Sequence, residues 1–234
     1  QGKLDQAVAS IHKALTIKPD YTEAQGVLVH VLQIMCSWGD QQSESGKLDE
    51  LVDLALREGN TPGEAPFTSV TRCDDLARNL EIAKKWSADV EMKMSSLRYQ
   101  LPADFNKTPR GKINVGYLSA DFHSHATAHL MLSLFGLHDR DKFHITAYSY
   151  GLNDGSEYRK RIENDCDAFV DIRYFSTIDA AQLIAEDEID ILIDLKGYTF
   201  QARQDICAIR PAPVQATYLG FPGTSGAEYF DYVI

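Results

Sequence analysis

The sequence contains few cysteines and no long apolar run. Its 234 residues include four cysteines, which lie far apart and form no C-x-x-C pair. This spacing favours free thiols in a reducing compartment over disulfides, so we expect a cytoplasmic protein. No apolar stretch approaches the roughly 18–20 residues needed to cross a bilayer, and we expect no membrane partner.

Three common active-site motifs are absent as well. The dinucleotide fingerprint G-x-G-x-x-G, the P-loop G-x-x-x-x-G-K-[ST] and the nucleophile elbow G-x-S-x-G do not occur. Hydride transfer and nucleoside triphosphate hydrolysis therefore lose support.

An excess of basic charge is also missing. The net charge is −11, and residues 111–234 carry 10 basic and 18 acidic side chains. Because this balance repels polyanions at long range, we expect no nucleic-acid partner. A mononucleotide could still bind through local dipoles or a few well-placed cations.

The first 38 residues predict a pair of helices. Residues 2–19 follow the pattern G-x-x-x-x-A-x-x-x-I-x-x-A-L-x-x-x-P, which resembles the second helix of a tetratricopeptide repeat. Residues 21–38 then predict the first helix of a following repeat. We expect the end of a longer repeat array here, and a stand-alone helical hairpin is the alternative.

Residues 39–110 predict an irregular helical region. We expect a polar break over 39–50, a short amphipathic helix over 48–56, a loop over 58–66 and a long helix over 73–101. Residues 102–111 are a linker of Pro, Asn, Lys and Gly, where we place the domain boundary. The expected division is therefore 1–38 (repeat array), 39–110 (helical linker region) and 111–234 (a Rossmann-like lobe).

From residue 112 onward, strand and helix patterns alternate, which predicts an α/β fold with a parallel sheet. Ile113, Val115, Tyr117 and Leu118 mark the first buried strand. Further strands are expected at 143–150, 168–172, 189–195, 214–219 and 231–234, with helices at 128–137, 155–167, 176–186 and 201–209. Because the sheet pattern stops partway through a unit, we expect the chain to be part of a larger enzyme.

Three histidines follow the first strand, at the edge of the sheet where ligands bind in doubly wound folds. They are His123, His125 and His129. Three imidazoles could bind zinc, but no further ligand is placed to complete a site, so we expect no metal. Solvated or helix-capping histidines are a second interpretation. We prefer a site histidine, His125, near a sugar or an acceptor hydroxyl, since imidazole exchanges a proton near neutral pH.

Two further loops should lie on the same edge. Lys196-Gly197-Tyr198-Thr199 follows a buried strand, so Lys196 could meet an anion and Thr199 a hydroxyl, although a simple turn is equally consistent. The loop over residues 220–226, GFPGTSG, exposes backbone N–H groups around Pro222, Gly223 and Thr224.

Four segments resemble one known family. They are LQIMCSWGD, VGYLSADFHSHATAHLM, DLKGYT and RPAPVQATYLGFPGTSGAEYFDYVI. They are similar to the O-linked N-acetylglucosamine transferases and the SPINDLY-type O-fucosyltransferases, and the resemblance covers nearly the whole chain. It implies a GT-B fold with two Rossmann-like lobes around a cleft. The implied reaction moves N-acetylglucosamine or a related sugar from a nucleotide sugar, UDP-GlcNAc, to Ser or Thr of proteins chosen by the repeats, without a metal or cofactor.

The resemblance also implies roles for residues. His125 falls on a histidine of the amino-terminal lobe that is catalytic or positions the acceptor, and Thr199 and the loop over 222–224 fall near the cleft. Lys196 stands where animal members have Asn. Most of the second, nucleotide-binding lobe is not in this sequence, so we expect the chain alone to have no turnover and to bind UDP weakly. The alternatives are a non-catalytic interaction module and a GT-B N-glucosyltransferase that acts on Asn.

Overall fold

The structure is a computed structural model, and it describes residues 3–101 and 111–234. The chain divides into two units, Gln1–Asp89 and Val90–Ile234, which are described separately. The linker expected at 102–111 lies, apart from Gly111, outside the described residues. The three-part division expected from the sequence stays a prediction.

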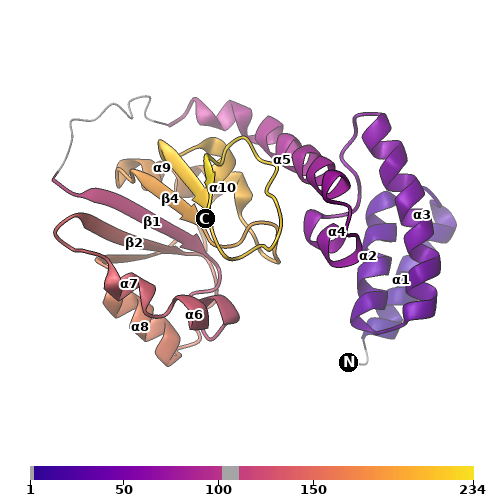
Figure 1. Ribbon diagram of the computed structural model, residues 1–234, viewed down its shortest axis with the longest axis horizontal. Helices are drawn as coiled ribbons and strands as arrows, with labels where there is room; N and C mark the ends of the chain where they lie inside the picture. The colour runs from indigo at the N-terminus through magenta and orange to yellow at the C-terminus, as the bar shows by residue number, and fades with distance from the viewer. Residues whose placement is uncertain (1–2, 102–110) are drawn as a thin grey trace. The chain divides into compact units, whose positions relative to one another are not determined.

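The described part of the first unit is helical, and helix α5 continues from it into the second unit. Its helices are α1 (Leu4–Ile17), α2 (Thr22–Ile34), α3 (Trp38–Arg57), α4 (Pro66–Arg72) and α5 (Leu76–Arg98) (Figure 1). The core is formed by Val29, Leu48, Val52 and Ile82, against which Leu56 and Trp86 pack. The expected first two helices, the loop before Pro66 and the long helix are all present.

The expected polar break over 39–50 is wrong, because α3 is one helix of 20 residues. Gln25 of α2 donates hydrogen bonds to the backbone oxygen and to Oε2 of Glu44, both at 2.9 Å. Leu48, one turn further on, is fully buried. A Cβ atom at Gly39 or Gly46 would meet nothing within 4 Å, so these glycines lie on open faces of the helix. Tertiary contacts thus override the low helix propensity of the segment.

A buried ion pair fixes the loop before α4. Glu64 is fully buried, and both its oxygens accept hydrogen bonds from Arg72, at 2.8 and 2.7 Å. Arg72 also lies 2.9 Å from Asp49 of α3. The pair therefore connects three segments of the first unit.

The second unit contains a parallel sheet of six strands, as expected. The strands are β1 (Ile113–Ser119), β2 (Phe143–Ser149), β3 (Ala168–Asp171), β4 (Ile191–Asp194), β5 (Val214–Thr217) and β6 (Tyr232–Val233). Their order is β3-β2-β1-β4-β5-β6, and every neighbouring pair is parallel. From β1 the chain moves outward through β2 to β3, and from β4 it moves the other way, through β5 to β6. The strand order therefore reverses between β1 and β4.

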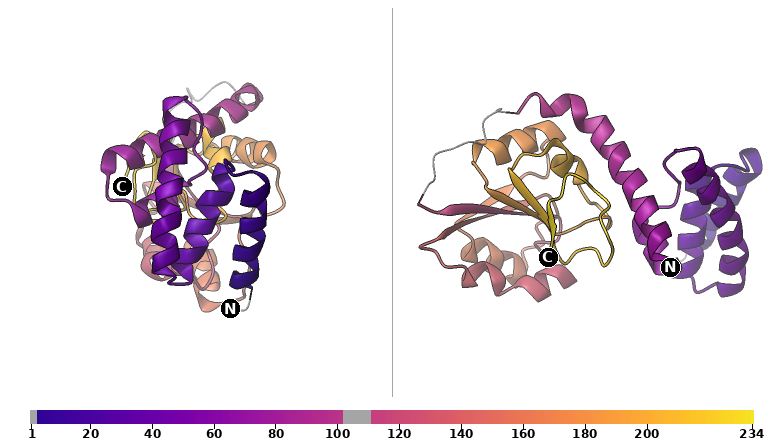
Figure 2. Two further views of the ribbon diagram at one scale, coloured as in Figure 1. Left: turned by 90° about the vertical axis from the view of Figure 1, so that its right-hand side faces the viewer. Right: turned by 45° about the horizontal axis from the view of Figure 1, so that its top comes forward.

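Helices cover both faces of this sheet (Figure 1). One face carries α9 (Thr177–Glu186) and α10 (Gln204–Ile209), and the other carries α6 (Ala126–Met131), α7 (Leu134–Leu137) and α8 (Glu157–Asp165). Figure 2 (right) shows the same layers from a second direction. Leu118 packs in the first layer, whereas Val115 and Tyr117 pack in the second. This alternation along β1 follows from the two-residue repeat of a strand.

One helix of the second unit differs from the sequence prediction, and one helix cap agrees with it. The helix expected over 128–137 is divided into α6 and α7. Met131 and Phe135 are nevertheless both buried, so the four-residue spacing holds across the division. The capping signal before α9 is confirmed, since the Ser176 side chain accepts a hydrogen bond from the backbone N–H of Asp179.

Candidate active site

The predicted site residues follow the carboxyl ends of β1, β4 and β5. The strand order reverses between the first two of these, β1 and β4. These strands are neighbours, and Leu118 pairs with Asp194 at their ends. Because the strand order reverses here, the connections leave the sheet in opposite directions. Open α/β sheets bind ligands in the crevice at such a point.

The loop after β1 is held at both ends. Asp121 donates its backbone N–H to the hydroxyl of Ser119 at 2.9 Å. Phe122 is buried against Phe135 and Phe169, with ring centroids 5.8 and 5.9 Å away. His125 then caps α6, because its Nδ1 accepts the backbone N–H of Thr127 at 3.2 Å. The loop thus places the imidazole by packing and hydrogen bonds.

The loop after β4 forms a tight turn around a buried carboxylate. Asp194 accepts the backbone N–H groups of Lys196 and Gly197 at 3.3 and 2.7 Å. Gly197 has a φ of +52°, which favours glycine. The hydroxyl of Thr199 donates to the backbone oxygen of Lys196 at 2.8 Å. The sequence K-G-Y-T is therefore a turn held by hydrogen bonds to Asp194 and to the Lys196 backbone oxygen.

This turn packs directly against the loop after β5. A Cβ atom at Gly220 would lie 1.9 Å from the backbone oxygen of Leu195, so only glycine allows this approach. The hydroxyl of Tyr198 donates to the backbone oxygen of Ser225 at 2.7 Å, and its ring meets Phe221 edge-on at 5.4 Å. The two loops expected on one edge therefore form one packed surface.

The exposed part of that surface lies in the second loop. Pro222 and Thr224 are exposed, and Gly223 is partly exposed. Thr199 is also partly exposed. The structure therefore leaves four of the predicted contact residues accessible on the edge, and their contacts with a substrate stay predictions.

Lys196 forms an ion pair with a carboxylate of the neighbouring loop. Its Nζ lies 2.7 Å from Oδ2 of Asp121, and both residues are buried. The same oxygen lies 3.5 Å from Nδ1 of His125, whose side chain is 41% exposed. A chain of three charged or titratable groups thus joins the two loops. A contact of Lys196 with an anionic ligand stays a prediction.

Burial changes the acidity of two groups here. Burial raises the pKa of Asp194 to about 7, against the opposing effects of the Gly197 and Lys196 N–H groups and of the Lys196 charge. Burial also lowers the pKa of His125. Asp121 acts in the opposite direction on His125, and Lys196 adds to the lowering. His125 is therefore favoured in its neutral form.

The other two histidines have different surroundings. His129 is exposed, and its ring lies 4.0 Å from that of Tyr158 on α8. His123 lies 5.5 Å from His125, ring to ring. Across residues 3–101 and 111–234, no group of three or more His, Cys, Asp or Glu is placed to hold a metal ion. The helix-capping interpretation therefore applies to His125. Capping uses Nδ1 and does not involve Nε2, so it is compatible with a role of His125 in the site.

Asp121 and Asp194 were not predicted from the sequence. Each had a weak signal: Asp121 precedes His125 by four residues, and Asp194 is a carboxylate inside the apolar run IDILIDL. An acidic side chain within a buried strand needs partners, so Asp194 could have been marked as a turn-forming residue. The pairing of Asp121 with Lys196 spans 75 positions and has no local signal.

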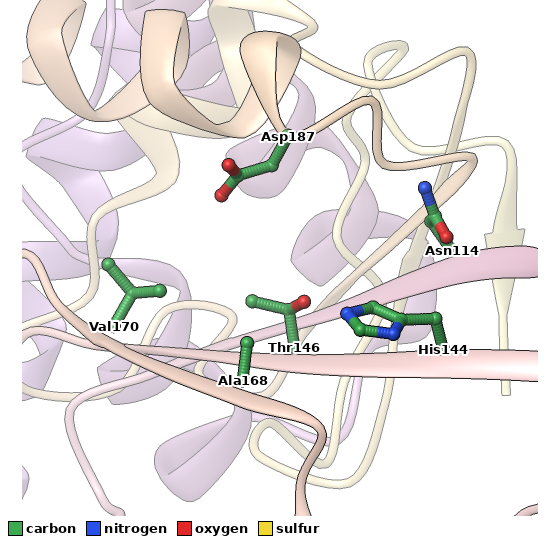
Figure 3. Close-up of a pocket in the computed structure, with 6 residues that line it drawn as sticks. All are labelled: Asn114, His144, Thr146, Ala168, Val170 and Asp187. Carbon is green, nitrogen blue, oxygen red and sulfur yellow. The ribbon is translucent and has the colours of Figure 1, made fainter. Parts of the chain in front are cut away.

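A separate hollow of about 310 Å³ lies toward the amino-terminal ends of the strands (Figure 3). It is lined by Asn114, His144, Thr146, Ala168, Val170 and Asp187. Asn114 and His144 are paired in register near the start of β1 and β2. None of the predicted site residues lines this hollow.

Within the described parts of the chain, no helix has the length and hydropathy of a membrane span.

Known proteins match most of this chain. Residues 35–234 match glycosyl transferase family 41. The chain is 35% identical over 213 residues to the probable UDP-N-acetylglucosamine–peptide N-acetylglucosaminyltransferase SEC of Arabidopsis thaliana, covering 88% of this chain and 22% of that protein. It is 36% identical over 208 residues to the UDP-N-acetylglucosamine–peptide N-acetylglucosaminyltransferase of Caenorhabditis elegans, covering 86% and 18%. The chain thus spans about a fifth of the length of these relatives.

A solved structure confirms the expected fold. A mutant of the O-GlcNAc transferase of Thermobaculum terrenum superposes with a TM-score of 0.51 at 20% identity, covering 99% of this chain and 53% of that one. The sheet of the second unit is accordingly the Rossmann-like lobe expected of a GT-B glycosyltransferase. A SPINDLY protein of Arabidopsis thaliana is also 34% identical over 131 residues, covering 55% of this chain and 14% of its own length. The resemblance seen in the sequence motifs is confirmed, and the chain belongs to glycosyl transferase family 41.

Proposed function

We propose that this chain supplies one wall of the catalytic cleft of a protein O-glycosyltransferase. The enzyme transfers N-acetylglucosamine, or a related sugar, from UDP to Ser or Thr of proteins. The observation that carries this proposal is that Asp121, beside His125, joins the loops after β1 and β4 where the strand order reverses, and that the loop after β5 packs against the loop after β4. Two relatives with 35% and 36% identity are named as UDP-N-acetylglucosamine–peptide transferases, which supports this donor and acceptor class.

His125 is the proposed catalytic residue. Its imidazole is partly exposed, and Nδ1 accepts the Thr127 N–H, so we assign Nε2 as the atom that contacts the substrate. A neutral imidazole at this place can hydrogen-bond the acceptor hydroxyl or a sugar oxygen. Proximity and orientation of this kind supply a large share of catalysis in group transfer.

The two packed loops would contact the substrates. Thr199 uses its hydroxyl proton within the turn, so its oxygen can still accept a hydrogen bond. Pro222, Gly223 and Thr224 form the accessible part of the second loop. Because this loop is locked against the K-G-Y-T turn, it offers a rigid surface to a sugar or a peptide backbone.

The helical unit and the cellular compartment complete the proposal. The helices of the first unit would bind protein acceptors, as repeat helices do with extended concave surfaces. The four cysteines are free, one of them exposed, which suits the reducing cytoplasm.

The test is sugar transfer by the protein that carries these 234 residues. UDP-N-acetylglucosamine and other labelled nucleotide sugars are offered with a protein extract, and labelled Ser or Thr is identified by mass spectrometry. His125→Ala should lower kcat/KM by about 10²–10³-fold, the usual effect of losing one hydrogen-bond donor positioned for the transition state. His144→Ala is the matched control, because His144 has 46% side-chain exposure and lies at the opposite end of the sheet.

Three results would overturn the proposal. Label found on Asn would indicate an N-glucosyltransferase. No transfer from any nucleotide sugar would indicate an interaction module. An unchanged rate in His125→Ala would remove that residue from the site.

A further inference from the structure

One carboxylate oxygen of Asp121 lies near both Lys196 and His125. Oδ2 of Asp121 lies 2.7 Å from Nζ of Lys196 and 3.5 Å from Nδ1 of His125. The His125 contact is longer than a hydrogen bond, whereas the Lys196 contact is short and charge-assisted. Lys196 is therefore the stronger partner of this oxygen.

The second partner of Nδ1 shows its protonation state. Thr127 donates its backbone N–H to Nδ1 at 3.2 Å, and a nitrogen that accepts a hydrogen bond cannot also carry a proton. In the neutral ring the proton then sits on Nε2, which becomes a donor. This tautomer has no free lone pair with which to take a proton from a substrate.

The opposite tautomer is available in principle. If the ring gave up the Thr127 contact, an Nδ1–H group could donate to Asp121, and Nε2 would present a free lone pair. Acid–base enzymes use a carboxylate behind a histidine in this way. In this chain, Lys196 both occupies the carboxylate oxygen and neutralises its charge.

We propose that Lys196 is a positioning residue that acts through Asp121 to hold His125 as the neutral Nε2–H tautomer. His125 then offers the substrate a hydrogen-bond donor and is not a general base. The identity of that substrate rests on the proposed function, whereas the tautomer does not. Lys196 is 4% exposed, so water does not compete for its contact with Asp121.

The two neighbouring histidines and Lys196 favour the neutral form of His125. His123 and His129 act on it from its own loop and from α6, and both lower its pKa, as Lys196 does from the loop after β4. Asp121 acts in the opposite direction. Asp154, from the loop after β2, accepts the backbone N–H of Ser124 and faces His123.

Nitrogen-15 NMR of the histidine rings tests the proposal on the full 234-residue chain. Long-range proton–nitrogen correlations distinguish the two neutral tautomers, and the signals of His125 are assigned by their loss in His125→Gln. In the unaltered chain we expect the Nε2–H pattern. In Lys196→Met we expect the Nδ1–H pattern and a pKa of His125 raised by about one unit, because the Asp121 charge is no longer neutralised.

Two variants show that the effect comes through the charge pair. Lys196→Arg keeps the positive charge and should retain the Nε2–H pattern. Asp121→Asn combined with Lys196→Met removes both charges and should bring back the Nε2–H pattern that Lys196→Met alone is expected to lose. Lys142→Met is the control, since Lys142 is a 73% exposed lysine paired with Asp139 at the amino-terminal end of β2.

The proposal is overturned if Lys196→Met keeps the Nε2–H pattern and the pKa of the unaltered chain. It is also overturned if the unaltered chain shows the Nδ1–H pattern. If Lys196→Met loses the dispersed spectrum of a folded protein, Lys196→Gln is measured with the same expectation, since its amide has no charge but keeps a donor. A confirmed tautomer without any sugar transfer would refute the proposed function and leave this inference standing.

Discussion

Lys196 of the loop after β4 and Asp121 of the loop after β1 form an ion pair of 2.7 Å, and neither side chain is more than 8% exposed. The pair joins two loops that are 75 residues apart in sequence, at the point where the strand order reverses. Breaking a buried pair leaves an uncompensated charge, which is costly, whereas the net value of an intact pair is small. The stability of the edge and the state of His125 therefore depend on the same contact.

Removing one partner of this pair should destabilise the second unit. We expect Asp121→Ala to lower the free energy of unfolding by about 3–5 kcal/mol, the usual cost of leaving one buried charge unpaired. Urea unfolding followed by circular dichroism measures this. Asp171→Ala is the control, because the Asp171–Arg173 pair is 40% and 26% exposed and such pairs contribute about 0–1 kcal/mol. Equal losses in the two variants would show that the Lys196–Asp121 pair has no special weight.

The sheet was predictable from the sequence because its signal is local. Val115 and Tyr117 alternate with Leu118 along one strand, and turn residues separate that strand from the next helix. The course of α3 was not predictable in this way, since the contact of Gln25 with Glu44 that fixes it joins different helices. Likewise, His125 and Lys196 could be selected by residue type and position, but the pairing of Lys196 with Asp121 could not. Local sequence patterns predict helices, strands and the edge of the sheet where a site lies. The pairing of side chains across that edge is visible only in the folded structure.

The contact between the loops after β4 and β5 should be intolerant of a single methyl group. Gly220→Ala would place Cβ 1.9 Å from the backbone oxygen of Leu195, and backbone cannot move aside without opening the turn. We expect a loss of stability of about 2 kcal/mol or more, as for overpacked positions. Gly46→Ala is the control, because its Cβ meets nothing within 4 Å and it lies inside α3. That variant should be more stable by about 0.5–1 kcal/mol. Thermal unfolding of both variants measures the difference, and equal melting temperatures would contradict it.

The stability of the first unit should depend on the buried Glu64–Arg72 pair in the loop before α4. Glu64→Ala leaves the guanidinium of Arg72 buried with Asp49 as its remaining acidic contact, so we expect a loss of about 3–5 kcal/mol. Glu58→Ala is the matched control, because Glu58 is exposed in the same loop region and should change stability by less than about 0.5 kcal/mol. Denaturant unfolding monitored by Trp86 fluorescence reports on this unit, since the indole N–H of Trp86 bonds the Pro62 backbone oxygen. A loss in Glu64→Ala no larger than in the control would show that the pair is dispensable.

The buried carboxyl group of Asp194 should make stability fall as the pH rises. Burial raises its pKa in the folded chain to about 7, from a usual value of 3.8, so the folded state binds the proton more tightly than the unfolded state. Its stabilising contribution is therefore complete below about pH 4 and is lost progressively as the pH rises toward 7. Other carboxyl groups have the opposite dependence, and Asp194→Asn separates them, because Asn keeps an acceptor for the Gly197 N–H. The free energy of unfolding of the unaltered chain minus that of Asp194→Asn should decrease between pH 4 and pH 7, on the order of a few kcal/mol in total. A difference that stays constant, or that increases, over this range would show that Asp194 is ionised throughout. In that case the Lys196 charge and the two backbone N–H groups outweigh burial.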